Sequence, residues 1–506
     1  MKEKVRNSSV AGIDLGTGFS ELAILDDTGR PTIIPNLDGE FKTPSVVYVA
    51  SQLAEIVIGT AALGMGVIHP ERVITQCKRD VGTNKVYFTE NGISVTSEWA
   101  QAEILKYLRA SAIKHTGDDQ AASRAVITVP AYFKENQRQS VQRSAEIAGI
   151  EVMGLINEPT AAGLSHGLVE KQGDRLVLIV DFGQGTFDCS LVSFGGGNAT
   201  VIASHGDNQL GGKDVDDTLL RLVLEQFDTQ HSLHITPESH PADWFQIWQQ
   251  VVRQKERLSA CSLVKVCARV DGKQIMLELT RDTLAEQIHN LLERAERVID
   301  EVIANGKVDP KEITHVLLIG GSSRLTPFQE LIRRKFGQER IHGGNVSPDL
   351  AVAEGAAIKA AKVVLSSGGT VVDCSLRAIP APAISTTDVM PHSLGVSVQD
   401  PVSLIETCSS ILEKNQPLPC NASRQFGSVK DDQRVFVVSV LQGEEGQLTK
   451  DCLVVGQRQI ELPPRPPGQP SLEVRMGYDT SGMVNVRFRD LVSGVHETIT
   501  VNFFNE

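Results

Sequence analysis

The stretch from Leu176 to Val192 reads LVLIVDFGQGTFDCSLV. Apolar residues run into an acid, Asp181, and a glycine-rich turn leads to a second acid, Asp188, and another apolar segment. This pattern predicts a β-hairpin made of a buried strand, a turn and a second strand. Backbone N–H groups at such a tip can bind a phosphate, and a carboxylate at the strand end can hold a hydrated Mg²⁺. The pattern fits an ordinary hairpin equally well, in which the glycines only make the turn.

A second segment repeats this order of features. Val10 to Ser20 reads VAGIDLGTGFS, with an acid in the strand, Asp14, followed by a Gly-Thr-Gly turn and a returning apolar strand. Two such segments far apart indicate an internal duplication at the scale of a domain. We therefore expect two similar lobes that offer a phosphate loop and a carboxylate each to a shared cleft. A third glycine turn follows a buried strand in HVLLIGGSSR (315–324), and ligands of α/β folds gather at such strand ends.

Length and composition indicate a globular protein of several domains. The chain has 506 residues, of which 41% are hydrophobic and 22% are charged, and it is too long for one ordinary core. Its net charge of -13 disfavours binding to nucleic acid or to an anionic membrane. The sequence shows no signal-peptide pattern and no apolar run of membrane-spanning length, and its 8 cysteines form no CxxC pair. We expect a cytoplasmic protein with reduced thiols and no membrane partner.

The patterning divides the chain into three parts, which makes the fold class multidomain α/β plus β. Residues 1–365 alternate strands and helices, with lobes at about 1–175 and 176–365. Residues 366–387 are rich in glycine, proline and small residues and read as a linker. Residues 388–506 show short alternating strands between turns, which predicts an all-β sandwich. No helical pattern follows these strands, so we expect no C-terminal helical lid.

Several motifs make the chain resemble the heat shock protein 70 (DnaK-type) chaperones. IDLGTG, ITVPAYF, INEPTAAG, DFGQGTFD, LGGKD and LLIGGSSR occur in the order of that family, followed by SPDLAVAEGAAI, DVMPHSLGV and VLQGE. The resemblance covers nearly the whole chain. Actin and the sugar kinases share the two-lobed nucleotide fold but lack the motifs of the sandwich. The resemblance implies an actin-like (ribonuclease H-like, duplicated) ATPase domain followed by a peptide-binding β-sandwich.

The resemblance also implies an activity and partners. It implies a chaperone of protein folding and the stress response that binds and hydrolyses ATP and couples this to binding of unfolded or extended polypeptide. The implied cofactors are ATP or ADP, Mg²⁺ and K⁺, and the further partners are a J-domain co-chaperone and a nucleotide exchange factor. The alternative is a nucleotide-dependent interaction module for one dedicated partner, with little general chaperone activity. A small-molecule kinase, a third hypothesis, would lack the sandwich.

The resemblance assigns the catalytic side of the cleft residue by residue. Asp14, Glu158 and Asp181 match the Mg²⁺ ligands of the family, which act through water. Phosphoryl transfer needs mainly positioning and charge neutralisation, which a metal, a lysine and backbone amides supply. The residues matched to the γ-phosphate, the attacking water and the K⁺ site are Thr17, Lys78, Thr186 and Asp188.

Further matched residues bind the cofactor or connect the domains. Those of the two phosphate loops are Gly16, Gly18, Phe19, Gly183, Gln184 and Gly185. Those of the nucleoside side are Gly212, Lys255, Ser259, Gly320, Gly321, Ser322, Arg324 and Asp349. Those of the relay between the cleft and the sandwich are Pro130, Arg138 and Asp388. A two-state coupling follows from the relay, in which ATP lowers peptide affinity and peptide promotes hydrolysis.

Some positions of the ATPase part depart from the family pattern. Gln184 stands where the hairpin has a third glycine, and we expect its side chain to limit backbone freedom and to crowd the phosphate. Gly18 and Phe19 replace a hydroxyl residue and a polar or tyrosine residue in the first loop. Val252 replaces a ribose-binding glutamate, so we expect weaker nucleotide affinity. Gly154 replaces a basic residue that helps to dock J-domain co-chaperones, which weakens the case for that partner.

The predicted peptide pocket, made of Phe426, Phe436 and Val438, has its own departure. Phe436 falls where the family has a small valine at the pocket floor, and Val438 shares its strand face by the two-residue period. The ring either fills the pocket and excludes a leucine side chain, or only repacks the core. Phe436 and the missing lid favour the dedicated-partner alternative. Lys78 and the three carboxylates favour hydrolysis.

Overall fold

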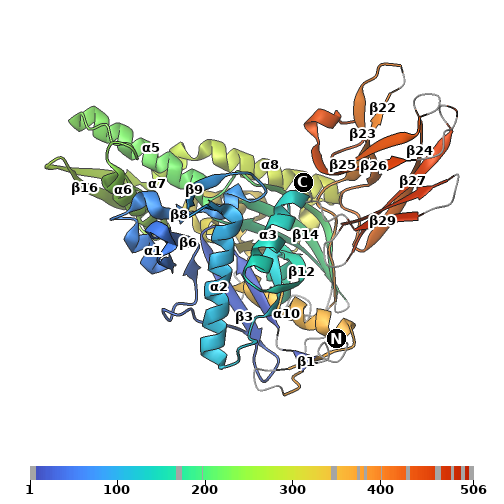
Figure 1. The fold of residues 1–506 in the computed structure, drawn as a ribbon. Coiled ribbons are helices and arrows are strands. Elements are labelled where there is room, and N and C mark those ends of the chain that lie inside the picture. The colour runs from blue at the N-terminus through green and yellow to red at the C-terminus, as the bar shows by residue number, and fades with distance from the viewer. Residues whose placement is uncertain are drawn as a thin grey trace.

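The computed structural model describes residues 7–8, 10–166, 174–195, 198–342, 350–372, 377–380, 385–400, 402–428, 433–461, 466, 469–479, 484–491 and 496–500. These residues form a mixed α/β protein with several separate sheets (Figure 1). No helix in these residues is both long enough and apolar enough to cross a membrane.

The first large sheet has the order β12-β11-β2-β3-β4, with β5 also paired to β3. Strands β2 and β3 form the antiparallel hairpin expected around the first glycine turn, and Asp14 pairs with Glu21 across it. β11 runs parallel to both β2 and β12. Its strands are β2 (Ala11–Leu15), β3 (Phe19–Leu25), β4 (Pro31–Ile33), β5 (Thr43–Pro44), β11 (Arg124–Val129) and β12 (Glu151–Asn157).

The second large sheet has the order β19-β18-β13-β14-β15-β21. The hairpin predicted from Leu176 to Val192 is confirmed, because β13 and β14 pair antiparallel with Asp181 opposite Asp188. β18 runs parallel to β13, and Val316, Leu317 and Ile319 in it are buried, as its apolar sequence predicts. The strands are β13 (Arg175–Phe182), β14 (Phe187–Gly195), β15 (Asn198–Asp207), β18 (His315–Ile319), β19 (Ile341–His342) and β21 (Ser385–Thr387).

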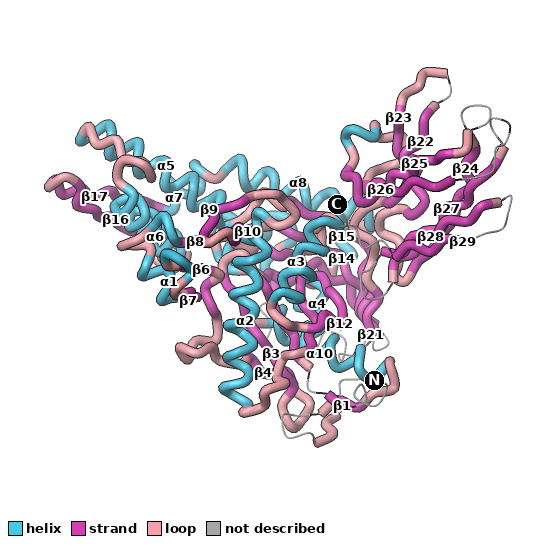
Figure 2. The backbone as a smooth tube through the Cα atoms, in the orientation of Figure 1, coloured by secondary structure: helices cyan, strands magenta, loops and turns pink. Residues whose placement is uncertain are grey.

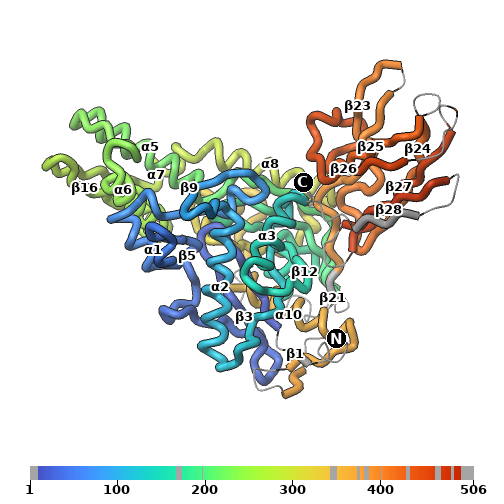
Figure 3. The backbone as a smooth tube through the Cα atoms, in the orientation of Figure 1, coloured from blue at the N-terminus to red at the C-terminus, as the bar shows by residue number. Residues whose placement is uncertain are grey.

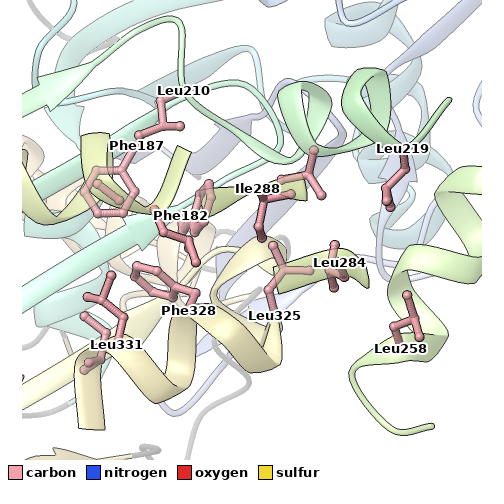
Figure 4. Packing of buried hydrophobic residues seen from close by; sticks show 14 of the residues in the cluster. Phe182, Phe187, Leu210, Leu219, Leu258, Leu284, Ile288, Leu325, Phe328 and Leu331 are labelled. Atoms are coloured by element: carbon pink, nitrogen blue, oxygen red, sulfur yellow. The ribbon is translucent and has the colours of Figure 1, made fainter. Parts of the chain in front are cut away.

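Helices cover both sheets and fill the cores. In the second core the rings of Phe182, Phe187 and Phe328 meet edge to face at 5.0 to 5.9 Å, and Figure 4 shows Leu331 beside them. The helices are α2 (Ser97–Thr116), α3 (Glu135–Ile147), α4 (Glu158–Ser165), α5 (Gly212–His231), α6 (Pro241–Leu258), α7 (Arg281–Gln287), α8 (His289–Gly306), α9 (Thr326–Phe336) and α10 (Ala351–Ser366).

Helix α10 joins the two large sheets. In Figure 3 it is drawn in orange beside the blue strand β3, although the two are far apart in sequence. Its alanines and glycine permit very close packing, because a Cβ on Gly355 would lie 1.8 Å from the carbonyl oxygen of Ala161 in α4. One hydrophobic cluster therefore draws residues from both sheets, from α4 and from α10. This shared core holds the two large sheets, and with them the glycine turns after β2 and β13, at a fixed separation.

Smaller elements extend from the two large sheets. A three-stranded sheet of order β7-β6-β8 and the hairpin β9–β10 belong to the first half, and the hairpin β16–β17 packs against α6 in the second. The parallel pair β1–β20 lies near the N-terminus. The elements are β1 (Asn7–Ser8), β6 (Val46–Val49), β7 (Ile56–Ile58), α1 (Thr60–Met65), β8 (Val73–Thr75), β9 (Val86–Glu90), β10 (Ile93–Thr96), β16 (Leu263–Val270), β17 (Lys273–Thr280) and β20 (Thr370–Val371).

The C-terminal part consists of strands, drawn in magenta in Figure 2, with one short helix, η7 (Thr449–Asp451), in its described residues. Two four-stranded antiparallel sheets, β23-β22-β25-β26 and β24-β27-β28-β29, share one hydrophobic core. The strands are β22 (Leu394–Gln399), β23 (Glu406–Leu412), β24 (Cys420–Gly427), β25 (Val435–Gln442), β26 (Leu453–Glu461), β27 (Pro470–Tyr478), β28 (Val484–Asp490) and β29 (His496–Thr500). The described residues of this part are therefore built almost entirely from strands and their connections.

Candidate functional site

A cleft of about 340 Å³ lies where the strand-end loops of the two large sheets face each other. It brings together most of the residues that the sequence assigned to metal and nucleotide. The predicted residues that line it are Asp14, Gly16, Thr17, Gly18, Phe19, Lys78, Glu158, Asp181, Gly183, Gln184, Gly185, Thr186, Lys255, Ser259, Gly320, Gly321, Ser322 and Arg324. The sequence reasoning missed five further lining residues, which are Glu21, Lys42, Glu256, Leu325 and Val352.

Acidic side chains gather at the floor of the cleft. Asp14 and Asp181 are the next-to-last residues of β2 and β13, and Glu158 is the first residue of α4. Burial, followed by the charge of Glu158, raises the pKa of Asp14 to about 7, and it also raises the pKa of Asp181 well above the ordinary value. Buried acids that repel one another in this way are relieved when a cation comes near.

Lys78 supplies one positive charge at this floor. It lies in η3 (Cys77–Asp80), and its Nζ is 2.7 Å from Oε1 of Glu158. Burial disfavours the ammonium, but the charges of Glu158 and Asp14 outweigh this, and the pKa of Lys78 is raised. One lysine does not balance the acids around it, which leaves room for a further cation.

The donor set fits a hydrated metal better than a directly bound one. No group of three or more His, Cys, Asp or Glu side chains in the described ranges is arranged to hold a metal ion directly. Asp14 already accepts a hydrogen bond from Oγ1 of Thr128 at 2.8 Å. Mg²⁺ keeps several of its waters and reaches protein carboxylates through them, so this cluster suits Mg²⁺ with its water shell.

The two glycine turns contact each other across the cleft. A Cβ placed on Gly185 would lie 2.1 Å from Oγ1 of Thr17, so only glycine fits opposite that threonine. Ser322 fixes the second turn from the side, because its Oγ donates to the carbonyl oxygen of Gly183 at 2.9 Å. Ser45 fixes the first turn in the same way, through the carbonyl oxygen of Gly16 at 2.7 Å. The turns are thus held with their backbones facing the cleft.

Gln184 does not need the backbone freedom of a glycine. The φ angle of Gln184 is not positive, so its backbone takes a conformation that any residue can adopt. Its Nε2 donates to Oδ2 of Asp216 at 2.6 Å. The turn therefore does not require glycine at this position, and the expectations that the side chain limits backbone freedom and crowds a phosphate stay predictions.

The nucleoside side of the cleft is built on α6 and on the loop after β18. Lys255 is buried, and its Nζ lies 2.7 Å from Oδ1 of Asp216. Gly320 has a φ of +77°, and a Cβ there would lie 2.5 Å from Oδ1 of Asp181, so this turn needs glycine. Gly212 lies beside the cleft and accepts a hydrogen bond from Lys255 at its carbonyl oxygen. Val252 belongs to α6 but does not line the cleft.

Two described residues that were predicted for the nucleotide site, Gly212 and Asp188, do not line the cleft. Asp349 lies outside the described residues. Asp188 is fully buried behind the hairpin, where its Oδ1 accepts a hydrogen bond from the N–H of Tyr132 at 3.0 Å. Its Oδ2 has no hydrogen-bond partner in the described part of the chain, and burial raises its pKa to about 7. A small cation could satisfy this oxygen, which does not line the cleft itself.

Two of the predicted relay residues, Arg138 and Asp388, are connected through Asn157. Arg138 donates through Nη2 to Oδ1 of Asn157 at 2.7 Å, and Nδ2 of Asn157 donates to Oδ2 of Asp388 at 2.8 Å. Pro130 is buried directly after β11. The sequence reasoning missed Asn157, although its place directly before Glu158 was a signal. These hydrogen bonds therefore connect Asp388, at the start of the C-terminal part, to Asn157, which directly precedes Glu158 of the acidic cluster.

Further contacts hold the C-terminal sheets against α3 and the loop before it. The N–H of Glu135 donates to Oε1 of Gln442 at 3.0 Å. The ring of His392 lies 4.3 Å from that of Tyr132, and its Nε2 is 3.1 Å from the carbonyl oxygen of Tyr132. The hydroxyl of Tyr478 is 3.5 Å from Oε2 of Glu135. The two parts of the molecule are docked in this structure.

The predicted peptide-pocket residues lie in the core of the C-terminal sheets. Phe436 and Val438 point to the same side of β25 and are buried, with Phe436 9% exposed. Phe426, on β24 of the other sheet, is partly buried against the same cluster. The Phe436 ring therefore packs among core residues, and nothing in the described residues separates the pocket-filling role from the core-packing role.

Comparison with known proteins gives matches that span nearly the whole chain. The family model described as "Hsp70 protein" matches residues 10–505. A relative named "Chaperone protein DnaK", from Thermosipho africanus (strain TCF52B), is 33% identical over 500 residues, which is 97% of this chain and 80% of the relative.

Proposed function

Because the chain belongs to the Hsp70 protein family, we propose that its cleft is the site of ATP hydrolysis and that the chain Arg138–Asn157–Asp388 couples this site to polypeptide binding. Family membership makes the protein an ATP-dependent chaperone and an ATPase that uses ATP or ADP with Mg²⁺. The observation that carries the site proposal is the cluster of Asp14, Glu158, Asp181 and Lys78 in the same cleft as two glycine loops.

In this proposal the protein acts by positioning. Asp14, Glu158 and Asp181 would hold Mg²⁺ through water, and the ion would supply charge neutralisation at the phosphates. The hydroxyls of Thr17 and Thr186, with the backbone N–H groups of the two turns, orient the γ-phosphate. No covalent bond between protein and phosphate is required, since phosphoryl transfer to water needs alignment and charge stabilisation.

Lys78 has a second role in the proposal. In the structure it pairs with Glu158, so an arriving phosphate competes with this carboxylate for the ammonium. A lysine is a compact charge on a flexible stem, which allows it to change partner over a few ångströms. The ammonium would then stabilise the charge on the transferred phosphoryl group and orient the attacking water.

A K⁺ ion is a further proposed cofactor. The unpartnered buried Oδ2 of Asp188 supports it, because a buried carboxylate oxygen without a hydrogen bond is costly. A monovalent cation next to it would also lower the raised pKa of this group. Asp188 would then act from behind the hairpin and not from the cleft surface.

The actin-like ATPase fold for residues 1–365, the linker 366–387 and the sandwich 388–506 belong to the same proposal. They are supported by the two large sheets joined by α10 and by the two all-strand sheets that follow. We propose unfolded or extended polypeptide as the substrate, bound near Phe426, Phe436 and Val438. A J-domain co-chaperone, a nucleotide exchange factor and a cytoplasmic location complete it. Gly154, buried in β12, offers no charge for the J-domain contact.

The test of the site is steady-state ATP turnover by the Asp181→Asn variant. The variant keeps the shape but removes a carboxylate of the proposed metal cluster, so turnover should fall by about 100-fold or more. Folding should survive, because the buried carboxylate is already destabilised by its neighbours. Asp217→Asn is the matched control, since Asp217 lies on α5 and pairs with Lys213 at the surface. Full turnover by Asp181→Asn would contradict the assignment of the cleft.

A further inference from the structure

The side chain of Gln184 connects the second phosphate loop to two helices. Its Nε2 donates to Oδ2 of Asp216 in α5 at 2.6 Å. The other oxygen of Asp216 lies 2.7 Å from Nζ of Lys255 in α6, and Lys255 also donates to the carbonyl oxygen of Gly212 at 3.2 Å. Asp216 is fully buried and Lys255 nearly so. Interactions in such a buried network are strong because its members are desolvated.

The same side chain meets the first phosphate loop across the cleft. A Cβ placed on Gly18 would lie 2.9 Å from Cβ of Gln184 and 3.1 Å from its Cγ. Real Cβ atoms essentially never come within 3.0 Å of a heavy atom of a non-neighbouring residue. The Cβ of Gln184 cannot move away easily, because it is fixed by its own backbone. Residue 18 can therefore carry no side chain while Gln184 holds its position. The glycine in one loop provides the room that the glutamine in the other loop occupies.

We propose that Gln184 is a positioning residue for phosphoryl transfer, which sets the spacing of the two phosphate loops, and that Gly18 is its required counterpart. The inference rests on the proposed nucleotide site and adds the residue pair that determines its geometry. Gln184 fixes the second loop through Asp216 and limits how closely the first loop approaches at Gly18. Displacements of about 1 Å in such loops are enough to change hydrolysis rates strongly.

Asp216 is central to this arrangement, because it serves Gln184 and Lys255 together. Burial raises the pKa of Asp216, while Lys255 and the Gln184 amide oppose this shift. When the amide is removed, Asp216 depends on Lys255 alone for its stabilisation in the described structure. Asp216 then no longer links Lys255, on the nucleoside side of the cleft, to the second phosphate loop.

The test is a double-mutant cycle on Gly18→Ala and Gln184→Gly, with the ATP dissociation constant and the single-turnover hydrolysis rate as readouts. Gly18→Ala alone should weaken ATP binding by about tenfold, since its methyl group pushes the loops apart. The double variant should bind ATP within about threefold of the wild type, because removing the glutamine side chain restores the room. Gly64→Ala is the matched control, as a Cβ on Gly64 meets nothing within 4 Å.

A third variant, Gln184→Met, separates spacing from hydrogen bonding. Methionine keeps most of the volume but cannot donate to Asp216, so the single-turnover rate should fall by about tenfold while the ATP dissociation constant changes by less than about threefold. Thermal unfolding of every variant checks that the loss is not a loss of fold. If Gly18→Ala fails to fold, Gln184→Gly and Gln184→Met still decide the inference through their hydrolysis rates.

The outcomes distinguish the inference from the proposed site. If the wild type binds ATP but the effects of Gly18→Ala and Gln184→Gly on binding are additive, the Gly18–Gln184 pair is overturned and the nucleotide site still stands. Unchanged hydrolysis in Gln184→Gly and Gln184→Met would overturn the positioning role of the glutamine. No ATP binding by the wild type would overturn both the inference and the site.

Discussion

Lys78 and Glu158 form an ion pair on the floor of the cleft, with Nζ 2.7 Å from Oε1 and side chains that are 3% and 10% exposed. Burying such a pair brings little net stability, because desolvation of both charges offsets their attraction. The pair lies beside Asp14 and Asp181, so its position is better explained by charge balance at a phosphate site than by folding. This relationship leads directly to the first prediction.

Replacing Lys78 with alanine should lower ATP turnover by about 100-fold or more, since the charge that stabilises the phosphoryl group is lost. The free energy of unfolding should fall by about 3 kcal/mol, because Glu158 loses its buried partner, yet the protein should stay folded. Lys85→Ala is the control, as Lys85 pairs with Asp80 at the surface. Turnover assays and thermal unfolding measure the two effects. Normal turnover in Lys78→Ala would remove this lysine from the mechanism.

Replacing Phe436 with valine should reveal whether its ring blocks a peptide site. The change removes buried volume, so the free energy of unfolding should fall by about 2 kcal/mol. We expect an apolar peptide to stimulate ATP turnover more strongly in Phe436→Val than in the wild type, since the smaller side chain leaves more room in the pocket. Phe488→Val is the matched control, because Phe488 lies on β28 and is buried in the same core. Equal stimulation of the wild type would show that the ring only packs the core.

Acidification should undock the C-terminal sheets through His392. Burial, with the charges of Arg138, Lys134 and His205 nearby, holds the pKa of His392 well below its usual range. A base with a lowered pKa binds fewer protons in the docked state, so docking is favoured at neutral pH and weakens as pH falls below about 6.5. Each pH unit below that value should cost about 1.4 kcal/mol.

The undocking can be followed by energy transfer between dyes on the two parts of the molecule, between pH 7.5 and 5.5. His392→Asn should remove most of the pH dependence, because asparagine keeps a hydrogen-bonding group but does not titrate in this range. His289→Asn is the control, since His289 is exposed and pairs with Glu293 within α8. A pH profile that His392→Asn leaves unchanged would assign the effect to another group.

The local features of the fold were predictable from the sequence. The hairpin around Asp181 and Asp188 follows from apolar runs that flank a glycine turn, and its antiparallel pairing is confirmed. The echo around Asp14 predicted the second loop, and the structure brings both loops to one cleft. These features depend on residues close together in the chain, where strand periodicity and turn chemistry decide the conformation.

The side-chain partners that act over long distances were not predictable in the same way. Asp216 is one of several acids in its helix, and its selection by Gln184 and Lys255 depends on how α5 and α6 pack. Asn157 reads as a helix start, and its contact to Asp388 arises only when the C-terminal part docks. Gly18 and Gln184 were each recognised in the sequence as a departure from the family pattern. That the two residues face each other was not predictable, because their contact exists only in the assembled cleft.

Removing the ion pair between Arg79 and Asp214 should speed the release of nucleotide. Nη2 of Arg79, in η3 beside Lys78, lies 2.5 Å from Oδ2 of Asp214 in the first turn of α5, so the pair closes the two halves of the molecule over the cleft. Both side chains are largely buried, and the Asp214 carboxylate also accepts the N–H of Gly211 at 2.7 Å, which holds it in place. Arg79→Ala should therefore raise the dissociation rate of a fluorescent ADP by about tenfold, since opening of such a cleft limits release.

The matched control for this variant is Arg72→Ala. Arg72 forms a partly buried ion pair of similar length with Glu90, but both residues belong to the first half of the chain, so the pair does not cross the cleft. Its loss should leave the dissociation rate of ADP unchanged within about twofold, because a pair on one side of the cleft places no constraint on opening. Equal dissociation rates for the two variants would mean that the cleft is closed by other contacts, such as the bond from Gln249 to the carbonyl oxygen of Leu63 at 2.9 Å.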